Sequence, residues 1–234
     1  MKNLIKKFTF LVKSNSKSLK RKKLTEKEDW EFEWQSSRWN YLFSRPETKE
    51  KVLEYWIKYR YLREIKSIIA VNENSHILDV GCGISTVLHY LPGHRYGIDP
   101  LADRYKTIYR YPKDIHIQSA YGEHIPFEEN YFDVVFSSNA IDHTDNPVKV
   151  ISEIRRVLKP DGYFILTCEV FNSKISGERN SGHPHSLHLD ELLKLIENFS
   201  VIAQWDSPWY SLRGYVLEKP VTSQREFIFL LKKS

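Results

Sequence analysis

Residues 77–86 read Ile77-Leu78-Asp79-Val80-Gly81-Cys82-Gly83-Ile84-Ser85-Thr86. An apolar run of strand length, His76–Val80, leads into the two glycines, and the pattern predicts a helix over Ile84–Leu91. Glycine lets a backbone turn tightly and approach a ligand closely, and the start of a helix leaves unpaired N–H groups. This stretch therefore predicts a strand, a ligand-binding loop and a helix, in that order.

Short apolar runs alternate with amphipathic stretches on the C-terminal side of this loop. The predicted strands are Arg95–Asp99, Asp114–Gln118, Tyr131–Ser137, Tyr163–Cys168, Ser200–Trp205 and Glu226–Lys232, and the predicted helices are Pro147–Leu158 and Leu189–Asn198. An alternation of strands and helices implies parallel strands joined by right-handed crossovers. We therefore expect an α/β domain over residues 71–234.

The N-terminal side has a different character. Residues 1–23 form a basic, partly amphipathic tail, which is either a helix on an anionic membrane or a disordered end. Residues 24–70 are predicted to be a helical extension, with one long amphipathic helix over Glu47–Ala70.

Charge is unevenly divided along the 234 residues. The net charge is +5, yet residues 1–25 hold nine Lys or Arg and no acid, so the remainder carries −4. The basic balance is thus a property of the tail, which weakens the case for a nucleic-acid partner. Two cysteines and no apolar run of membrane-spanning length favour a cytoplasmic protein, with peripheral membrane contact through the tail as an option.

Two acids accompany the glycines. Asp79 lies two positions before Gly81, and Asp99 ends the next predicted strand, where a carboxylate can accept both hydroxyls of a ribose. A dinucleotide-binding loop needs a third glycine at the position that Thr86 occupies, which disfavours a nicotinamide-dependent oxidoreductase.

The chain resembles the class I S-adenosylmethionine (SAM)-dependent methyltransferases, in the small-molecule group related to the ubiquinone and menaquinone methyltransferases. Three blocks in the family's order carry the resemblance: Leu78–Gly83, Ala120–Ser138 and Glu153–Gly162. The resemblance covers about residues 50–205. It implies a Rossmann-like, doubly wound sheet of seven strands with an antiparallel edge strand, and SAM as the cofactor. No metal is expected, because no cysteine accompanies the three histidines within residues 183–188.

The resemblance also implies which residues bind the cofactor. In the family, the acid at Asp79 orients the methionine ammonium, the loop Gly81–Gly83 with Cys82 passes beneath methionine and ribose, and the acid at Asp99 binds the ribose diol. The adenine side corresponds to Tyr121, Gly122 and Glu123, and Ser138, which begins the loop after the fourth predicted strand, is also expected to bind the cofactor. Two positions depart from the family: Ser85 replaces its third glycine, and Tyr121 replaces the Asp beside the adenine amino group.

Each of these residues also has a purely structural interpretation. Asp79 could cap the turn, Asp99 could cap the following helix, Glu123 could organise its loop, and Cys82 could be a small packed residue.

Histidines mark the side on which an acceptor would bind. His143 follows the fourth strand and is a candidate base for the acceptor's proton, or a structural residue beside Asp142. His183 and His185 lie in the loop after the fifth strand, and similar His-Pro-His segments border the acceptor pocket in methyltransferases that modify surface polysaccharides. The alternative is that the segment with His183 and His185 is a solvent-exposed loop that does not contact an acceptor.

We therefore predict a methyltransferase that acts on a small-molecule or glycan acceptor, with oxygen favoured over nitrogen or carbon as the atom that is methylated. Two alternatives stay open. A nucleic-acid methyltransferase is suggested by the basic tail, although residues 137–140 read Ser-Ser-Asn-Ala where an Asn-Pro-Pro-Tyr motif would follow the fourth strand. The other is a non-catalytic, SAM-binding partner protein.

Overall fold

A computed structural model describes residues 25–40, 45, 50, 53, 54, 56, 57, 60–171, 185, 187–209, 212, 213, 216, 217 and 221–234. The predicted basic tail, residues 1–23, and His183 lie outside the described residues. Within the described part, no helix is both long and apolar enough to cross a membrane.

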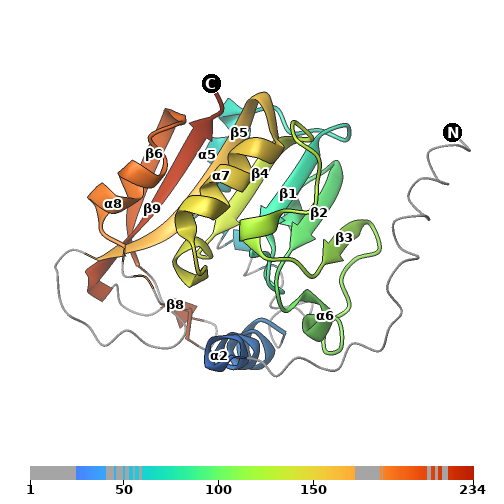
Figure 1. The fold of residues 1–234 in the computed structure, drawn as a ribbon. Coiled ribbons are helices and arrows are strands. Elements are labelled where there is room, and N and C mark those ends of the chain that lie inside the picture. Colours follow the sequence, from blue (N-terminus) through green and yellow to red (C-terminus); the bar gives the residue numbers. More distant parts are fainter. Residues whose placement is uncertain are drawn as a thin grey trace, which may run out of the picture.

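A seven-stranded sheet in the order β3-β2-β1-β4-β5-β9-β6 forms the centre of the molecule (Figure 1). Its strands are β1 His76–Val80, β2 His94–Ile98, β3 Ile115–Gln118, β4 Phe132–Ser138, β5 Leu158–Phe171, β6 Ser200–Trp209 and β9 Val221–Lys232. Strands β7 Leu212–Arg213 and β8 Val216–Leu217 form a separate pair. The expected doubly wound, seven-stranded sheet is confirmed. The antiparallel strand, however, is β9, which lies one place in from the edge, between β5 and β6.

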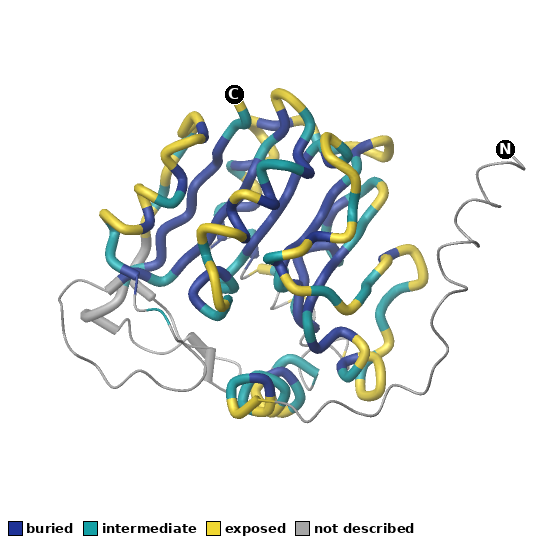
Figure 2. Tube along the Cα trace, viewed as in Figure 1, coloured by how far each residue is buried: buried dark blue, intermediate teal, exposed yellow. Residues whose placement is uncertain are grey.

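Helices cover both faces of the sheet and produce two apolar clusters. Helices α7 Pro147–Val157 and α8 Leu189–Leu195 pack on one face, and α5 Leu62–Ile68, the turn η2 Val87–Tyr90 and the segment containing α6 Ala102–Tyr105 pack on the other. Figure 2 shows that the strands between these layers are buried while the outward sides of the helices are exposed. Alternate residues of each strand supply the two clusters, as the pleat requires.

The switch in strand order from β1–β2 to β1–β4 positions the site. All these pairs are parallel, so the loops after β1, β2, β3 and β4 meet at one edge of the sheet. The helix α2 Glu26–Trp34 and the π-helical turn η1 Gln35–Asn40 lie across this edge (Figure 1). Two later loops include the short turns η3 Gly122–His124 and η4 Ile141–His143.

Two predicted helices are wrong in extent. The helix over Ile84–Leu91 is only the single turn η2, because the Thr86 hydroxyl accepts the Leu88 N–H at its start and Pro92 follows at its end. The predicted helix over Glu47–Ala70 breaks before α5, where Tyr61 has a left-handed backbone (φ 52°). At this break the Arg60 side chain is buried against the sheet.

Candidate functional site

The glycine loop after β1 has a backbone that only glycine adopts easily. Gly81 and Gly83 have φ values of 74° and 49°. A Cβ on Gly81 would lie 2.3 Å from the Ala140 Cβ, so the loops after β1 and β4 touch at this glycine. The N–H groups of Gly81 and Cys82 both donate to the Ile98 carbonyl, at 2.9 and 3.1 Å, which ties the loop to the end of β2.

Cys82 lies beneath the loop as a buried, packed side chain. A Cβ on Gly97 would lie 2.9 Å from the Cys82 Sγ, so the thiol occupies space that this glycine leaves free. Burial is the main cause that raises the pKa of this thiol well above its ordinary value, followed by repulsion from Asp99 and Asp79. A protonated, enclosed thiol is a poor nucleophile.

Asp79 is buried at the end of β1 and keeps one carboxylate oxygen without a partner. The Thr86 hydroxyl donates to its Oδ2 at 2.7 Å. Its Oδ1 is buried and accepts no hydrogen bond from the described residues. Burial raises the pKa of Asp79 to about 6, although the Thr86 hydrogen bond opposes the shift. An unsatisfied buried acceptor beside a glycine loop is suited to a ligand that carries a cationic donor.

Asp99 follows β2 and holds the backbone of two loops. Its Oδ2 accepts the Gly83 N–H at 3.1 Å, and its Oδ1 accepts the Leu101 N–H at 2.8 Å. Burial raises the pKa of Asp99 to about 7, the two backbone hydrogen bonds oppose this shift, and repulsion from Glu31 and Asp79 adds to it. Each oxygen retains a second lone pair, so the structural role leaves room for bonds from ribose hydroxyls.

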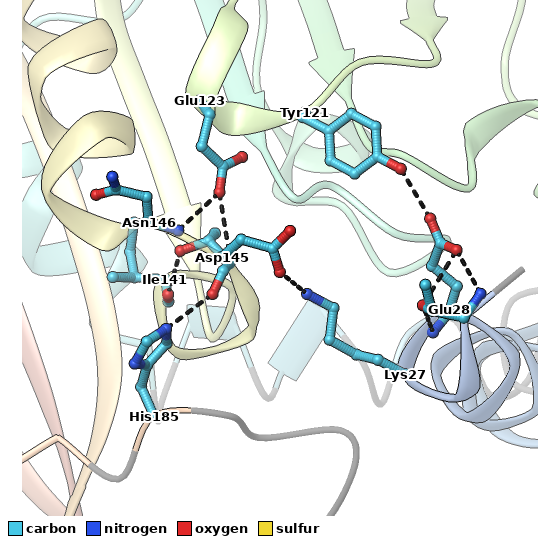
Figure 3. Close-up of polar contacts among 10 residues, drawn as sticks. Lys27, Glu28, Tyr121, Glu123, Ile141, Asp145, Asn146 and His185 are labelled. Atoms are coloured by element: carbon cyan, nitrogen blue, oxygen red, sulfur yellow. Dashed lines mark hydrogen bonds and ion pairs between the residues drawn. The ribbon is translucent and has the colours of Figure 1, made fainter.

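The three residues predicted on the adenine side make contacts with separate parts of the molecule, and Figure 3 shows Tyr121 and Glu123. The Tyr121 hydroxyl donates to Glu28 Oε1 at 2.8 Å, and this bond contributes with burial to a pKa of about 12. Gly122 is buried against Val150, where a Cβ would be crowded at 3.0 Å. The Glu123 carboxylate accepts the N–H groups of residues 145 and 146, and so organises the loop before α7.

The end of β4 brings polar groups toward the glycine loop. The Ser138 Oγ is buried without a hydrogen-bond partner among the described residues. Asn139 has a left-handed backbone (φ 50°) and donates from Nδ2 to Glu169 Oε1 at 3.1 Å. His143 lies in η4, with Nδ1 3.9 Å from Glu31 Oε2 and Nε2 3.8 Å from Asp142 Oδ2.

His185 is the first described residue after the end of β5. Its Nε2 donates to the Thr144 carbonyl at 2.9 Å (Figure 3), since a carbonyl oxygen can only accept. Its backbone N–H donates to the Asp142 carbonyl. His185 therefore ties this loop to the loop that carries His143. No group of three metal-ligating side chains occurs among the described residues.

Two residues of the N-terminal segment, Glu31 and Gln35, lie at the site although the sequence does not predict them there. Gln35 Oε1 accepts the Ile84 N–H at 3.0 Å, and Gln35 Nε2 donates to Glu31 Oε1 at 2.9 Å. Thr25 and Glu28 form a capping box that starts α2, and this Thr-x-x-Glu spacing was the one available signal in the sequence. It marks the start of a helix, but it does not reveal where that helix docks.

The residues present fit a cationic nucleoside-type ligand. Asp79 offers an unsatisfied buried oxygen, and Asp99 stands at the end of the neighbouring strand. Burial is the main cause that raises both pKa values, and a cationic ligand would favour the charged form of both acids. SAM carries both an ammonium and a sulfonium group, and such charges would complement these acids.

Comparison with known proteins agrees with this geometry. Residues 78–166 match the family described as "Methyltransferase domain". The sterol 4-C-methyltransferase strm-1 of Caenorhabditis elegans is 26% identical over 168 residues, covering 64% of this chain and 47% of that protein. The tRNA U34 carboxymethyltransferase of Campylobacter curvus is 30% identical over 102 residues, covering 40% and 34% respectively. The chain thus spans less than half the length of these two relatives.

A crystal structure of a SAM-dependent methyltransferase from Methanosarcina mazei superimposes with a TM-score of 0.58 at 18% identity. The match covers 73% of this chain and 96% of that chain, and at this identity it speaks for the fold alone. The glycine loop and both acids lie within the segment that matches the family. Residues 78–166 thus match a methyltransferase domain, and the chain has the class I, Rossmann-like fold.

Proposed function

We propose that this protein is a SAM-dependent methyltransferase that methylates a small-molecule or glycan acceptor on oxygen. The observation that carries the proposal is the pair of buried acids, Asp79 and Asp99, beside the left-handed glycine loop. The family match supports SAM as the cofactor. When bound, SAM supplies an activated methyl group on a sulfonium, so the protein has to align the acceptor and exclude water.

The proposed roles follow from the contacts at each position. Asp79 Oδ1 would accept from the ammonium of the methionine part, and Asp99 would accept from the ribose hydroxyls. His143 would take the proton of the acceptor, because it follows β4 at the edge where the loops meet and lies between two carboxylates.

A polar acceptor is supported by two side chains near the carboxyl ends of β4 and β5. Asn139 Nδ2 donates to Glu169, while the Asn139 Oδ1 is buried without a hydrogen-bond partner among the described residues. Hydroxyl groups of a sugar or another polar molecule can satisfy such an amide oxygen. The two relatives named above act on a sterol and on tRNA by their names, so the family match leaves the acceptor class open.

Product analysis tests this proposal. The full chain is incubated with SAM and fractions of a cell extract, and S-adenosylhomocysteine (SAH) and methylated products are measured by mass spectrometry. We expect SAH to form together with a methylated polar small molecule or glycan. Methylated RNA as the product would contradict the proposed acceptor, and absence of SAH formation with every fraction would favour a non-catalytic SAM-binding protein.

We also propose that residues 1–23 hold the protein at anionic membrane surfaces. Nine of the 35 Lys and Arg residues lie within residues 1–25, whereas the rest of the chain is acidic. Clustered basic residues are attracted to anionic lipid headgroups. This positive charge therefore bears on where the enzyme acts and not on what it methylates.

A further inference from the structure

The segment Glu26–Asn40, which we call the strap, is fastened across the loops that carry the site. Tyr121 donates to Glu28 at 2.8 Å, Lys27 pairs with Asp145 at 2.7 Å, and Figure 3 shows both contacts. At the loop after β2, Asp29 lies 3.3 Å from the Arg104 guanidinium. The strap is therefore held in place by the loops after β2, β3 and β4.

The inner side of the strap faces the glycine loop through Gln35. Its Oε1 accepts the Ile84 N–H, and a Cβ on Gly83 would lie 2.8 Å from its Nε2. The same Nε2 donates to Glu31 Oε1 at 2.9 Å. Gln35 thus fixes the direction in which the Glu31 carboxylate points.

Glu31 stands among the functional groups of the site. Its Oε2 lies 3.9 Å from His143 Nδ1, and its side chain is 26% exposed. Repulsion from Glu31 is one of the causes that raise the pKa of Asp99. Two cations that hold the strap, Lys27 and Arg104, pair with Asp145 and Asp29. The negative charge of Glu31 lies near His143 and acts on Asp99.

The chemistry of the two ligands gives this charge a consequence. The sulfur of SAM joins the ribose to the methionine part, so a ligand held at Asp99 and Asp79 brings its sulfur between these two acids. SAM has a positive sulfonium there, whereas the product SAH has a neutral thioether and is otherwise the same molecule. A nearby carboxylate therefore attracts SAM more than SAH.

We propose that Glu31 of the strap is a specificity residue that favours SAM over SAH by its charge. The inference rests on the proposed function, because it requires SAM to bind at the glycine loop. It goes beyond that function by assigning a role to the N-terminal segment. Discrimination of this kind eases the exchange of product for fresh cofactor, since the neutral product loses an attraction that the substrate had.

Calorimetry with the full chain tests the proposal without an acceptor. SAM, SAH and sinefungin are titrated into the wild type and into Glu31→Gln, which keeps the size of the side chain. Sinefungin carries an ammonium group in place of the sulfonium methyl. We expect Glu31→Gln to weaken SAM and sinefungin about fivefold to tenfold while SAH affinity changes less than twofold. The control Glu33→Gln, on an exposed position of the same helix, should leave the ratio of affinities unchanged.

The outcomes separate the two proposals. Equal weakening of all three ligands would mean that Glu31 only holds the strap, and this result would overturn the inference while leaving SAM binding intact. An unchanged SAM-to-SAH ratio in Glu31→Gln would overturn it as well. Failure of the wild type to bind SAM would overturn the proposed function itself.

Discussion

At the scale of single residues, two glycines and two acids define the site. Gly81 and Gly83 hold left-handed backbones, and Asp79 and Asp99 are buried on either side of them. These four residues could be predicted because they follow a buried strand at fixed spacing. Gln35 could not, because it reaches the same loop from 49 residues away in the sequence. Glu31 could not either, because its neighbour His143 belongs to the distant loop after β4. No local pattern encodes these contacts.

Replacing Gly81 by alanine should abolish measurable SAM binding. The new Cβ would meet the Ala140 Cβ at 2.3 Å on a backbone with φ 74°, so the loop has to move. We also expect the free energy of unfolding to fall by about 1–3 kcal/mol. Gly93→Ala is the matched control, since its φ is 95° and its Cβ would crowd the Ser75 carbonyl oxygen away from the site. That variant should lose stability but keep SAM affinity in calorimetry, and wild-type affinity in Gly81→Ala would contradict the assignment.

SAM affinity should increase as the pH rises from 5.5 to 7.5. The pKa values of Asp79 and Asp99 are raised to about 6 and about 7, so both acids gain their charge in this interval. A cationic ligand then binds more tightly, on the order of tenfold. Calorimetry at both pH values measures the change, which Asp99→Asn should reduce. An affinity that is flat or falls with rising pH would argue against these carboxylates as the cation site.

The same shifts have the opposite effect on the ligand-free protein. Because both pKa values lie above the ordinary carboxyl value of 3.8, the folded state binds protons more tightly than the unfolded state. The stabilisation from these protons is complete below about pH 3.8 and is lost as the pH rises through about 6 and 7. Bound SAM should offset this loss.

At the scale of elements, strands were easier to predict than helices. Short runs rich in apolar residues, such as Val134–Phe136, are buried between two layers, so the positions of their strands can be predicted from composition. The helix expected over Ile84–Leu91 is only one turn, because Thr86 caps its start and Pro92 follows its end. The break before α5 depends on a partner far along the chain, since Arg60 pairs with Glu226 of β9.

This buried pair yields a stability prediction. Arg60 and Glu226 are 8% and 4% exposed, and Arg60 also donates to the Thr167 hydroxyl at 2.5 Å. Glu226→Ala leaves a buried guanidinium without its carboxylate and should lower the free energy of unfolding in urea by about 3–5 kcal/mol. Asp103→Ala, which breaks an exposed pair with Lys106, should change it by less than about 1 kcal/mol. Similar losses of unfolding free energy in both variants would show that the buried Arg60–Glu226 pair stabilises the protein no more than an exposed pair.

At the scale of the whole molecule, charge is divided between the tail and the body. The net charge of +5 becomes −4 when residues 1–25 are set aside, and the site within the body is itself acidic. The parallel strands were predictable from the alternation of strands and helices, and the seven-stranded class I sheet was predicted from the resemblance to the family. The placement of the strap was not, because it depends on polar contacts to four separate loops.

Deletion of residues 1–23 tests the role proposed for the tail. The full chain should sediment with anionic vesicles at low salt and be released as salt is added, because each Lys or Arg contributes about 1 kcal/mol that ions screen. The shortened protein should stay in solution and retain its SAM affinity. Vesicle binding that ignores salt, or that survives the deletion, would exclude the proposed electrostatic contact.

The central claim is that the loop between Asp79 and Asp99 binds SAM. Calorimetry of the full chain with SAM, and with a nicotinamide dinucleotide as the control ligand, tests it most directly. We predict one SAM bound per chain, no dinucleotide binding, and loss of measurable SAM binding in Asp99→Ala and in Gly81→Ala. Absence of SAM binding by the wild type, or unchanged affinity in both variants, would contradict the account.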